Sequence, residues 1–126
     1  MKPAIILAAL LWLTPQMVAD KCVSEASFAV RECACTVYNR LHAKPRPWSE
    51  YKVLDAYYAV SGHASAEQVQ AVADVLSGAA ACGPEYFIYS KEDVAYLGYG
   101  HYEPVAVVTD GDRAVMLFSR WFRREQ

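Results

Sequence analysis

The segment SEASFAVRECACTVYNRLH, residues 24–42, decides the fold. At steps of about 100° around a helix, its apolar and small side chains fall on one side, namely Val30, Cys33, Ala34, Val37 and Leu41. Lys44-Pro45-Arg46-Pro47 follows, and proline cannot continue a helix. The pattern predicts one amphipathic helix from about Ser24 to His42 that packs against a core.

The opposite side of this predicted helix carries a polar stripe of Glu25, Glu32, Thr36 and Asn39. Such a stripe usually faces solvent, and we expect the same here. Cys33 and Cys35 lie about 160° apart around the helix, so they cannot form a disulfide with each other.

The remainder of the chain predicts short helices and a small antiparallel sheet. A short helix is expected over Tyr51–Ala59, and another runs from the capping box of Ser65 and Gln68 to near Gly78. A further helical turn opens at Ser90, and strands are expected at 86–89, 105–109 and 114–119. We therefore expect one α+β domain with two or three helices and a short antiparallel sheet or hairpin.

The N-terminus has the organisation of a secretory signal peptide. Lys2 precedes an apolar run from Ala4 to Leu13, which a polar break follows. A run of about ten residues is too short for a bilayer, which needs about 20. We expect cleavage after Ala19, a mature domain of residues 20–126, and no membrane span after cleavage.

The cysteines and the charge narrow the class of protein further. Cys22, Cys33, Cys35 and Cys82 all lie beyond the expected cleavage position, and an even number in an exported chain favours disulfides over a metal site. We expect Cys82 to pair within the 22–35 segment, and two complete connectivities remain open. A net charge of −2 argues against general nucleic-acid binding. No pattern calls for a cofactor, and the expected location is secreted or periplasmic.

Aromatic residues offer candidate contacts to a sugar. The chain has nine tyrosines and three tryptophans, and flat rings with a polar edge suit sugar faces, although they also fill small cores. We name Trp48, Tyr51 and Tyr86 as candidate substrate-binding residues.

Two short motifs carry a family resemblance. Ser24-Glu25-Ala26 followed by a helix that closes in Asn39-Arg40, and the small-residue turn 78–83 before Tyr86-Phe87, resemble the spore-cortex-lytic cell-wall hydrolases. That family has a lysozyme-like fold and cleaves peptidoglycan glycans, often as lytic transglycosylases. Glu25 and Asn39 are closer together than is usual in the family. Either the domain is a trimmed version, or Glu25 is not the family's glutamate.

The resemblance implies an exported enzyme that cleaves peptidoglycan or another cell-wall glycan with Glu25 as general acid. A general acid must stay protonated near neutral pH, which needs an apolar setting that raises its pKa. Glu25 is expected at a helix start, where the dipole favours the ionised form instead. A hydrolase would use a second carboxylate, and none stands out among Glu32, Glu50, Asp55, Glu92 and Asp93. A lytic transglycosylase does not need one, because the sugar's own hydroxyl is the nucleophile, so the sequence favours transglycosylation. The alternative is a catalytically silent, disulfide-stabilised binding or inhibitor domain.

Overall fold

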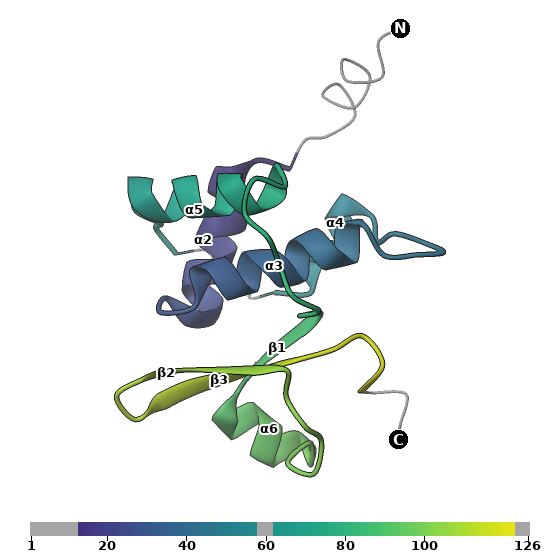
Figure 1. Cartoon of the computed structure of the whole chain (residues 1–126). Helices are drawn as coiled ribbons and strands as arrows, with labels where there is room; N and C mark the ends of the chain where they lie inside the picture. The colour runs from purple at the N-terminus through teal and green to yellow at the C-terminus, as the bar shows by residue number, and fades with distance from the viewer. Residues whose placement is uncertain (1–12, 58–61, 123–126) are drawn as a thin grey trace, which may run out of the picture.

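A computed structural model describes residues 13–57 and 62–122 (Figure 1). Within them, five helices accompany a three-stranded antiparallel sheet, which confirms the expected α+β class. In chain order the elements are α2 (Pro15–Ala26), α3 (Val30–Leu41), α4 (Glu50–Asp55), α5 (Ala66–Leu76), β1 (Phe87–Ser90), α6 (Lys91–Leu97), β2 (Ala106–Asp110) and β3 (Arg113–Phe118). Figure 1 shows α2, α3 and α5 on one side of the sheet and α6 on the other.

The prediction of one continuous helix over Ser24–His42 is wrong at its start. α2 ends at Ala26, and Ala29 leaves the helical conformation at φ −138° and ψ 41° before α3 begins at Val30. Glu25 therefore belongs to the last turn of one helix rather than the first turn of the next. No proline or glycine marks this break, so the apolar periodicity runs through it undetected.

The expected solvent-facing stripe is also wrong for two of its members. Thr36 is completely buried, and its hydroxyl donates to the Cys33 carbonyl at 2.6 Å. Asn39 donates its amide hydrogens to two backbone carbonyls, that of Gly83 at 3.0 Å and that of Glu85 at 2.6 Å. These polar side chains face neighbouring segments because α3 lies in the centre of the fold.

Two disulfides tie α3 to its neighbours on both flanks. Cys22–Cys33 joins α2 to α3, and Cys35–Cys82 joins α3 to the segment that follows α5. No cysteine is left free. The exclusion of a Cys33–Cys35 bond and the pairing of Cys82 within the 22–35 segment are both confirmed.

Residues 81–86, here called the α3-bound segment, lie along α3. Besides the Cys35–Cys82 bond, side chains of α3 donate hydrogen bonds to its carbonyl groups: Arg31 to Ala81 at 2.9 Å, Asn39 to Gly83 and Glu85, and Arg40 Nε to Tyr86 at 2.7 Å. The segment enters β1 directly, so α3 determines where the sheet begins.

Arg40 is the charged residue at the centre of this arrangement. It is only 5% exposed, and its guanidinium lies over four rings: Trp48 at 4.7 Å, Phe87 at 5.0 Å, Tyr57 at 5.1 Å and Tyr86 at 5.9 Å from the centroids. We call these rings the Arg40 cage. Among the described residues no carboxylate forms a salt bridge with Arg40. Cation–π attraction and the Tyr86 carbonyl compensate part of the buried charge, while Arg40 Nη1 is buried without a hydrogen-bond partner among the described residues.

The sheet has the order β1-β3-β2, and each of its faces contributes side chains to a core cluster. One face contributes Ile88, Val115 and Leu117 to the core shared with α2, α3 and α5. The other contributes Phe118 to a second cluster with α6, which also contains Val94, Tyr99 and Phe122. The pairing of Ile88 with Leu117 in β3 fixes which side chains face each core.

Most of the local predictions are confirmed at their expected positions. Ser65 and Gln68 form the capping box of α5, and the β2–β3 hairpin closes around Gly111 at φ 63°. α6 ends at Gly98, whose φ of 75° suits glycine. The helix expected over Tyr51–Ala59 is shorter, since α4 ends at Asp55, and residues 58–61 lie outside the described part.

The start of α2 overlaps the expected signal peptide. Thr14 caps the helix by accepting from the Met17 amide at 3.2 Å, and Val18 and Ala19 are 0% exposed. A cut after Ala19 would therefore remove a buried first turn, whereas residues 1–12 lie outside the described part. None of the helices in 13–57 and 62–122 has the length and apolar character needed to cross a membrane.

A chain that begins at Asp20 should be less stable than one that begins at Leu13. It loses the buried Val18, worth about 1.5–3 kcal/mol, and the Thr14 cap, worth about 0.5–2 kcal/mol. Urea unfolding of both chains without reductant measures the difference, and equal stability would contradict a structural role for this turn. N-terminal sequencing of secreted protein tests the expected start at Asp20, and an intact Met1 there would contradict the signal peptide.

Replacing Arg40 by lysine should destabilise the fold. Lysine keeps the charge but loses the planar guanidinium and its Nε bond to Tyr86, and a hydrogen bond to a charged group is worth about 1.5–3 kcal/mol. Arg31→Lys is the matched control, because this exposed arginine binds the same segment, and it should cost less than about 0.5 kcal/mol. Equal losses for the two variants in thermal unfolding would refute the role given to the Arg40 cage.

Candidate functional site

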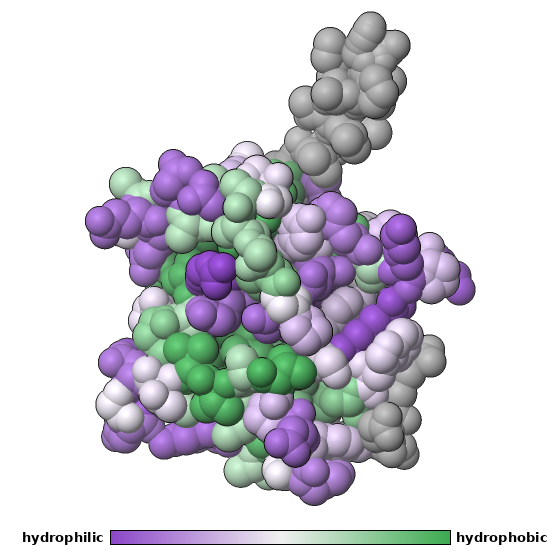
Figure 2. All heavy atoms as spheres, in the orientation of Figure 1, coloured by the Kyte–Doolittle hydropathy of each residue, from purple (hydrophilic) through white to green (hydrophobic). Residues whose placement is uncertain are grey.

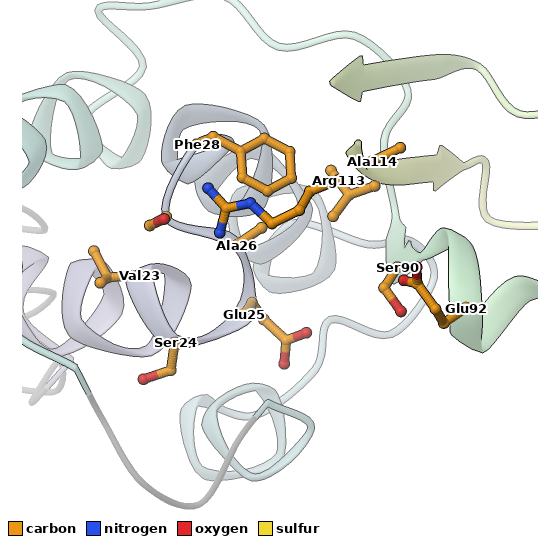
Figure 3. A pocket seen from close by; sticks show the side chains of 11 residues that line it. Val23, Ser24, Glu25, Ala26, Phe28, Ser90, Glu92, Arg113 and Ala114 are labelled. Atoms are coloured by element: carbon orange, nitrogen blue, oxygen red, sulfur yellow. The ribbon is translucent and has the colours of Figure 1, made fainter. Parts of the chain in front are cut away.

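Glu25 lines a cavity of about 190 Å³ between the end of α2 and the sheet. Its walls come from three distant parts of the chain: residues 23–28, Ser90 and Glu92 at the start of α6, and residues 113–115 at the start of β3. Figure 3 shows the Glu25 side chain extending from α2 into the space that faces Ser90 and Glu92. We call this cavity the Glu25 pocket.

The position of Glu25 in α2 changes its electrostatic setting. The sequence pattern places it at a helix N-terminus, but the structure places it next to the last residue of α2, Ala26. At this end the unpaired carbonyl groups and the negative end of the helix dipole favour a neutral carboxyl group over a carboxylate. Glu25 is also half-buried. Both features oppose ionisation of Glu25, whereas the positive charge of Arg113 in the same pocket lining favours it.

Phe28 and Arg113 form one wall of the Glu25 pocket. The Arg113 guanidinium lies 4.8 Å from the Phe28 ring centroid, and it also forms a 2.5 Å ion pair with Asp110. Figure 3 shows the two side chains together, on the same side of Glu25. This wall therefore presents an aromatic ring with a partly compensated positive charge beside it.

A buried polar group lies near the Glu25 pocket. The Thr36 hydroxyl donates to the Cys33 carbonyl, so the Tyr57 hydroxyl must be the donor in the bond between Tyr57 and Thr36. Burial raises the pKa of Tyr57 above its ordinary value of 10.0, the positive charge of Arg40 opposes this, and the charge of Glu25 adds to it. Tyr57 is thus within electrostatic range of both Arg40 and Glu25.

Residues 62–64 dock on α2 beside the Glu25 pocket. Asp20 accepts the Gly62 amide with its backbone carbonyl and the Ala64 amide with its carboxylate, both at 2.9 Å. A side chain at Gly62 would come within 3.0 Å of Val23 and 3.2 Å of Ser24, which line the Glu25 pocket. Any larger residue at this position would need the Val23 and Ser24 side chains to shift.

The three aromatic residues named from the sequence lie elsewhere. Trp48 and Tyr86 belong to the Arg40 cage, with their ring centroids 6.1 Å apart, and Tyr86 is buried. Trp48 also borders a separate, largely apolar cavity of about 720 Å³, together with Tyr38. Tyr51 is 70% exposed. None of the three lines the Glu25 pocket.

Ser90, Glu92 and Arg113 are pocket residues that the sequence pattern does not single out. Each looks locally like an ordinary cap, surface charge or turn residue: Ser90 caps α6, and Arg113 pairs with Asp110 across the hairpin. Only the tertiary fold brings them to Glu25. In the described ranges no cluster of three or more His, Cys, Asp or Glu residues could hold a metal ion.

Tyr57→Phe should lower stability in a pH-dependent way. At neutral pH the lost hydrogen bond should cost about 0.5–1.5 kcal/mol. The raised pKa makes the Tyr57 contribution complete below its unfolded value of 10.0, and lost as the pH rises through the folded-state value. Urea unfolding at rising pH measures the gap between the two proteins, with the exposed Tyr51→Phe as control. A gap that stays constant into strong alkali would contradict this.

Comparison with known proteins adds no relative: no family model, curated protein or solved structure matches the chain. The resemblance to spore-cortex-lytic hydrolases therefore rests on the sequence motifs alone.

Proposed function

We propose that this chain cleaves the glycan strands of peptidoglycan or a related cell-wall glycan, with Glu25 as the general acid. The observation that carries the proposal is the half-buried Glu25 carboxyl group, which lines a cavity from the C-terminal end of α2. A carboxyl group held there donates its proton to the glycosidic oxygen as the bond from that oxygen to the sugar's anomeric carbon breaks. Phe28 offers the ring face on which a sugar packs.

The Glu25 part of the family-like motif lines this pocket, and the Asn39-Arg40 part holds a segment that leads to its far wall. Glu25 supplies the acid at the end of α2. Asn39 and Arg40 hold the backbone of 83–86, and this segment runs into β1, whose last residue, Ser90, lines the opposite wall. Both parts of the motif are therefore linked to the same pocket, which supports the proposal.

The cysteine chemistry supports export to the compartment that holds the cell wall. All four cysteines form disulfides, and disulfides persist mainly in secreted and periplasmic proteins. The proposal therefore places the mature domain outside the cytoplasm, after removal of the N-terminal signal.

A second candidate function is a secreted binding or inhibitor domain without catalysis. Figure 2 shows apolar side chains gathered at the level of the sheet on the face turned to the viewer, and Val105 and Val107 are exposed in this part of the chain. Tyr96, at 88% exposure, and Trp121 add exposed aromatic rings. Such residues are typical of surfaces that bind a partner, and this function does not need Glu25.

Glu25→Gln tests the enzymatic proposal. The amide keeps the size of the side chain but has no proton to transfer, so release of soluble fragments from purified peptidoglycan should fall by about 10²–10⁴. The free energy of unfolding should change by no more than about 1 kcal/mol, the size of one helix-end interaction, because the amide has nearly the same size as the carboxyl group. Both quantities are measured for wild type and variant in parallel.

Glu32→Gln is the control, because Glu32 lies in the first turn of α3 and does not line the pocket. It should leave fragment release unchanged. A wild-type protein that releases no glycan, or a Glu25→Gln variant that matches it, would refute the enzymatic proposal in favour of the binding domain. Equal loss in both folded variants would show that the acid has been assigned to the wrong residue.

A further inference from the structure

The Glu25 pocket contains a second carboxylate that the sequence pattern alone ranks as a surface residue. Glu92, in the first turn of α6, lines the same cavity as Glu25. Figure 3 shows Glu25 at the end of α2 and Glu92 at the start of α6, on different walls of the pocket. The missing second carboxylate, which tilted the sequence interpretation toward transglycosylation, is therefore present in the fold.

The two glutamates stand in different environments. Glu25 is half-buried at the carbonyl end of a helix of twelve residues. Glu92 is exposed to water in the first turn of a different helix, α6. Two carboxyl groups whose surroundings differ in this way divide into an acid and a base. The charged groups that line the pocket are these two and Arg113, which is paired with Asp110.

We propose that the reaction at this pocket is hydrolysis, with Glu92 as the general base that activates a water molecule; this rests on the proposed function of Glu25. Glu25 gives its proton to the glycosidic oxygen as the bond to the anomeric carbon breaks. Glu92 takes a proton from water, whose oxygen forms the new bond to that carbon. One water is consumed, and both carboxyl groups regain their starting protonation by exchange with solvent.

The cavity has room for the attacking water. At about 30 Å³ for each water in the liquid, a cavity of about 190 Å³ corresponds to about six molecules, so a sugar and a neighbouring water can share the site and its mouth. A base that activates water makes water the nucleophile. The product should therefore be a reducing sugar, rather than an anhydro sugar formed by the substrate's own hydroxyl.

Product analysis on purified peptidoglycan in heavy-oxygen water tests the inference with the full mature chain. Wild type should release reducing ends that carry the heavy oxygen. Glu92→Gln should release them about 10²–10⁴-fold more slowly. Asp93→Asn is the matched control, because Asp93 lies in the same turn but does not line the pocket, and it should keep full activity. Thermal unfolding verifies that each variant is folded.

Three results would overturn the inference, and they separate it from the function of Glu25. Anhydro ends without heavy oxygen, released equally by wild type and Glu92→Gln, would exclude hydrolysis and leave Glu25 as the acid of a transglycosylase. Reducing ends released equally by both would exclude Glu92 as the base. No release by wild type would overturn the proposed function together with the inference.

Discussion

The rest of the structure depends on the hydrogen bond that Arg40 donates to the backbone carbonyl of Tyr86. Its Nε–H donates to the Tyr86 carbonyl at 2.7 Å while four aromatic rings enclose the guanidinium. A buried cation without a carboxylate partner is costly, and a well-packed apolar residue is often as stable in such a place. What an apolar residue could not supply is a directional bond that positions one carbonyl group. Arg40 therefore determines the geometry of the fold more than it adds to the total stability.

That geometry sets the register of the sheet and, through it, the pocket. Tyr86 is the residue before β1, so its position determines which residues of β1 face the helices. A slip of one residue would exchange Ile88 with a neighbour from the other face, because side chains alternate along a strand. The same slip would move Ser90, and with it the start of α6, away from Glu25. The hydrogen bond from Arg40 to Tyr86 therefore helps to set where the candidate base lies relative to the candidate acid. The Cys35–Cys82 disulfide holds the same segment against α3.

The sequence predicts those parts of the fold that depend on local chemistry. The apolar side of α3, the capping box at Ser65 and the hairpin around Gly111 all follow from spacing and turn residues. The break at 27–29 does not, since no helix-breaking residue marks it. Glu25 in the candidate site, and the 22–35 segment with which Cys82 pairs, were within reach, but the choice of Cys35 as its partner was not. Glu92 and Arg113 were not, because their role arises only when α6 and β3 are brought to α2.

The unpredicted break between α2 and α3 changes the electrostatic surroundings of Glu25. Helix ends favour opposite charge states of a carboxyl group, each by about 0.3–1 kcal/mol. Moving Glu25 from the expected start of α3 to the observed end of α2 therefore changes the balance between neutral acid and carboxylate by about 0.6–2 kcal/mol in favour of the acid. The same break turns the chain so that Phe28 packs over the acid's pocket under Arg113. A turn of three residues between two disulfide-linked helices thus determines which helix end holds Glu25.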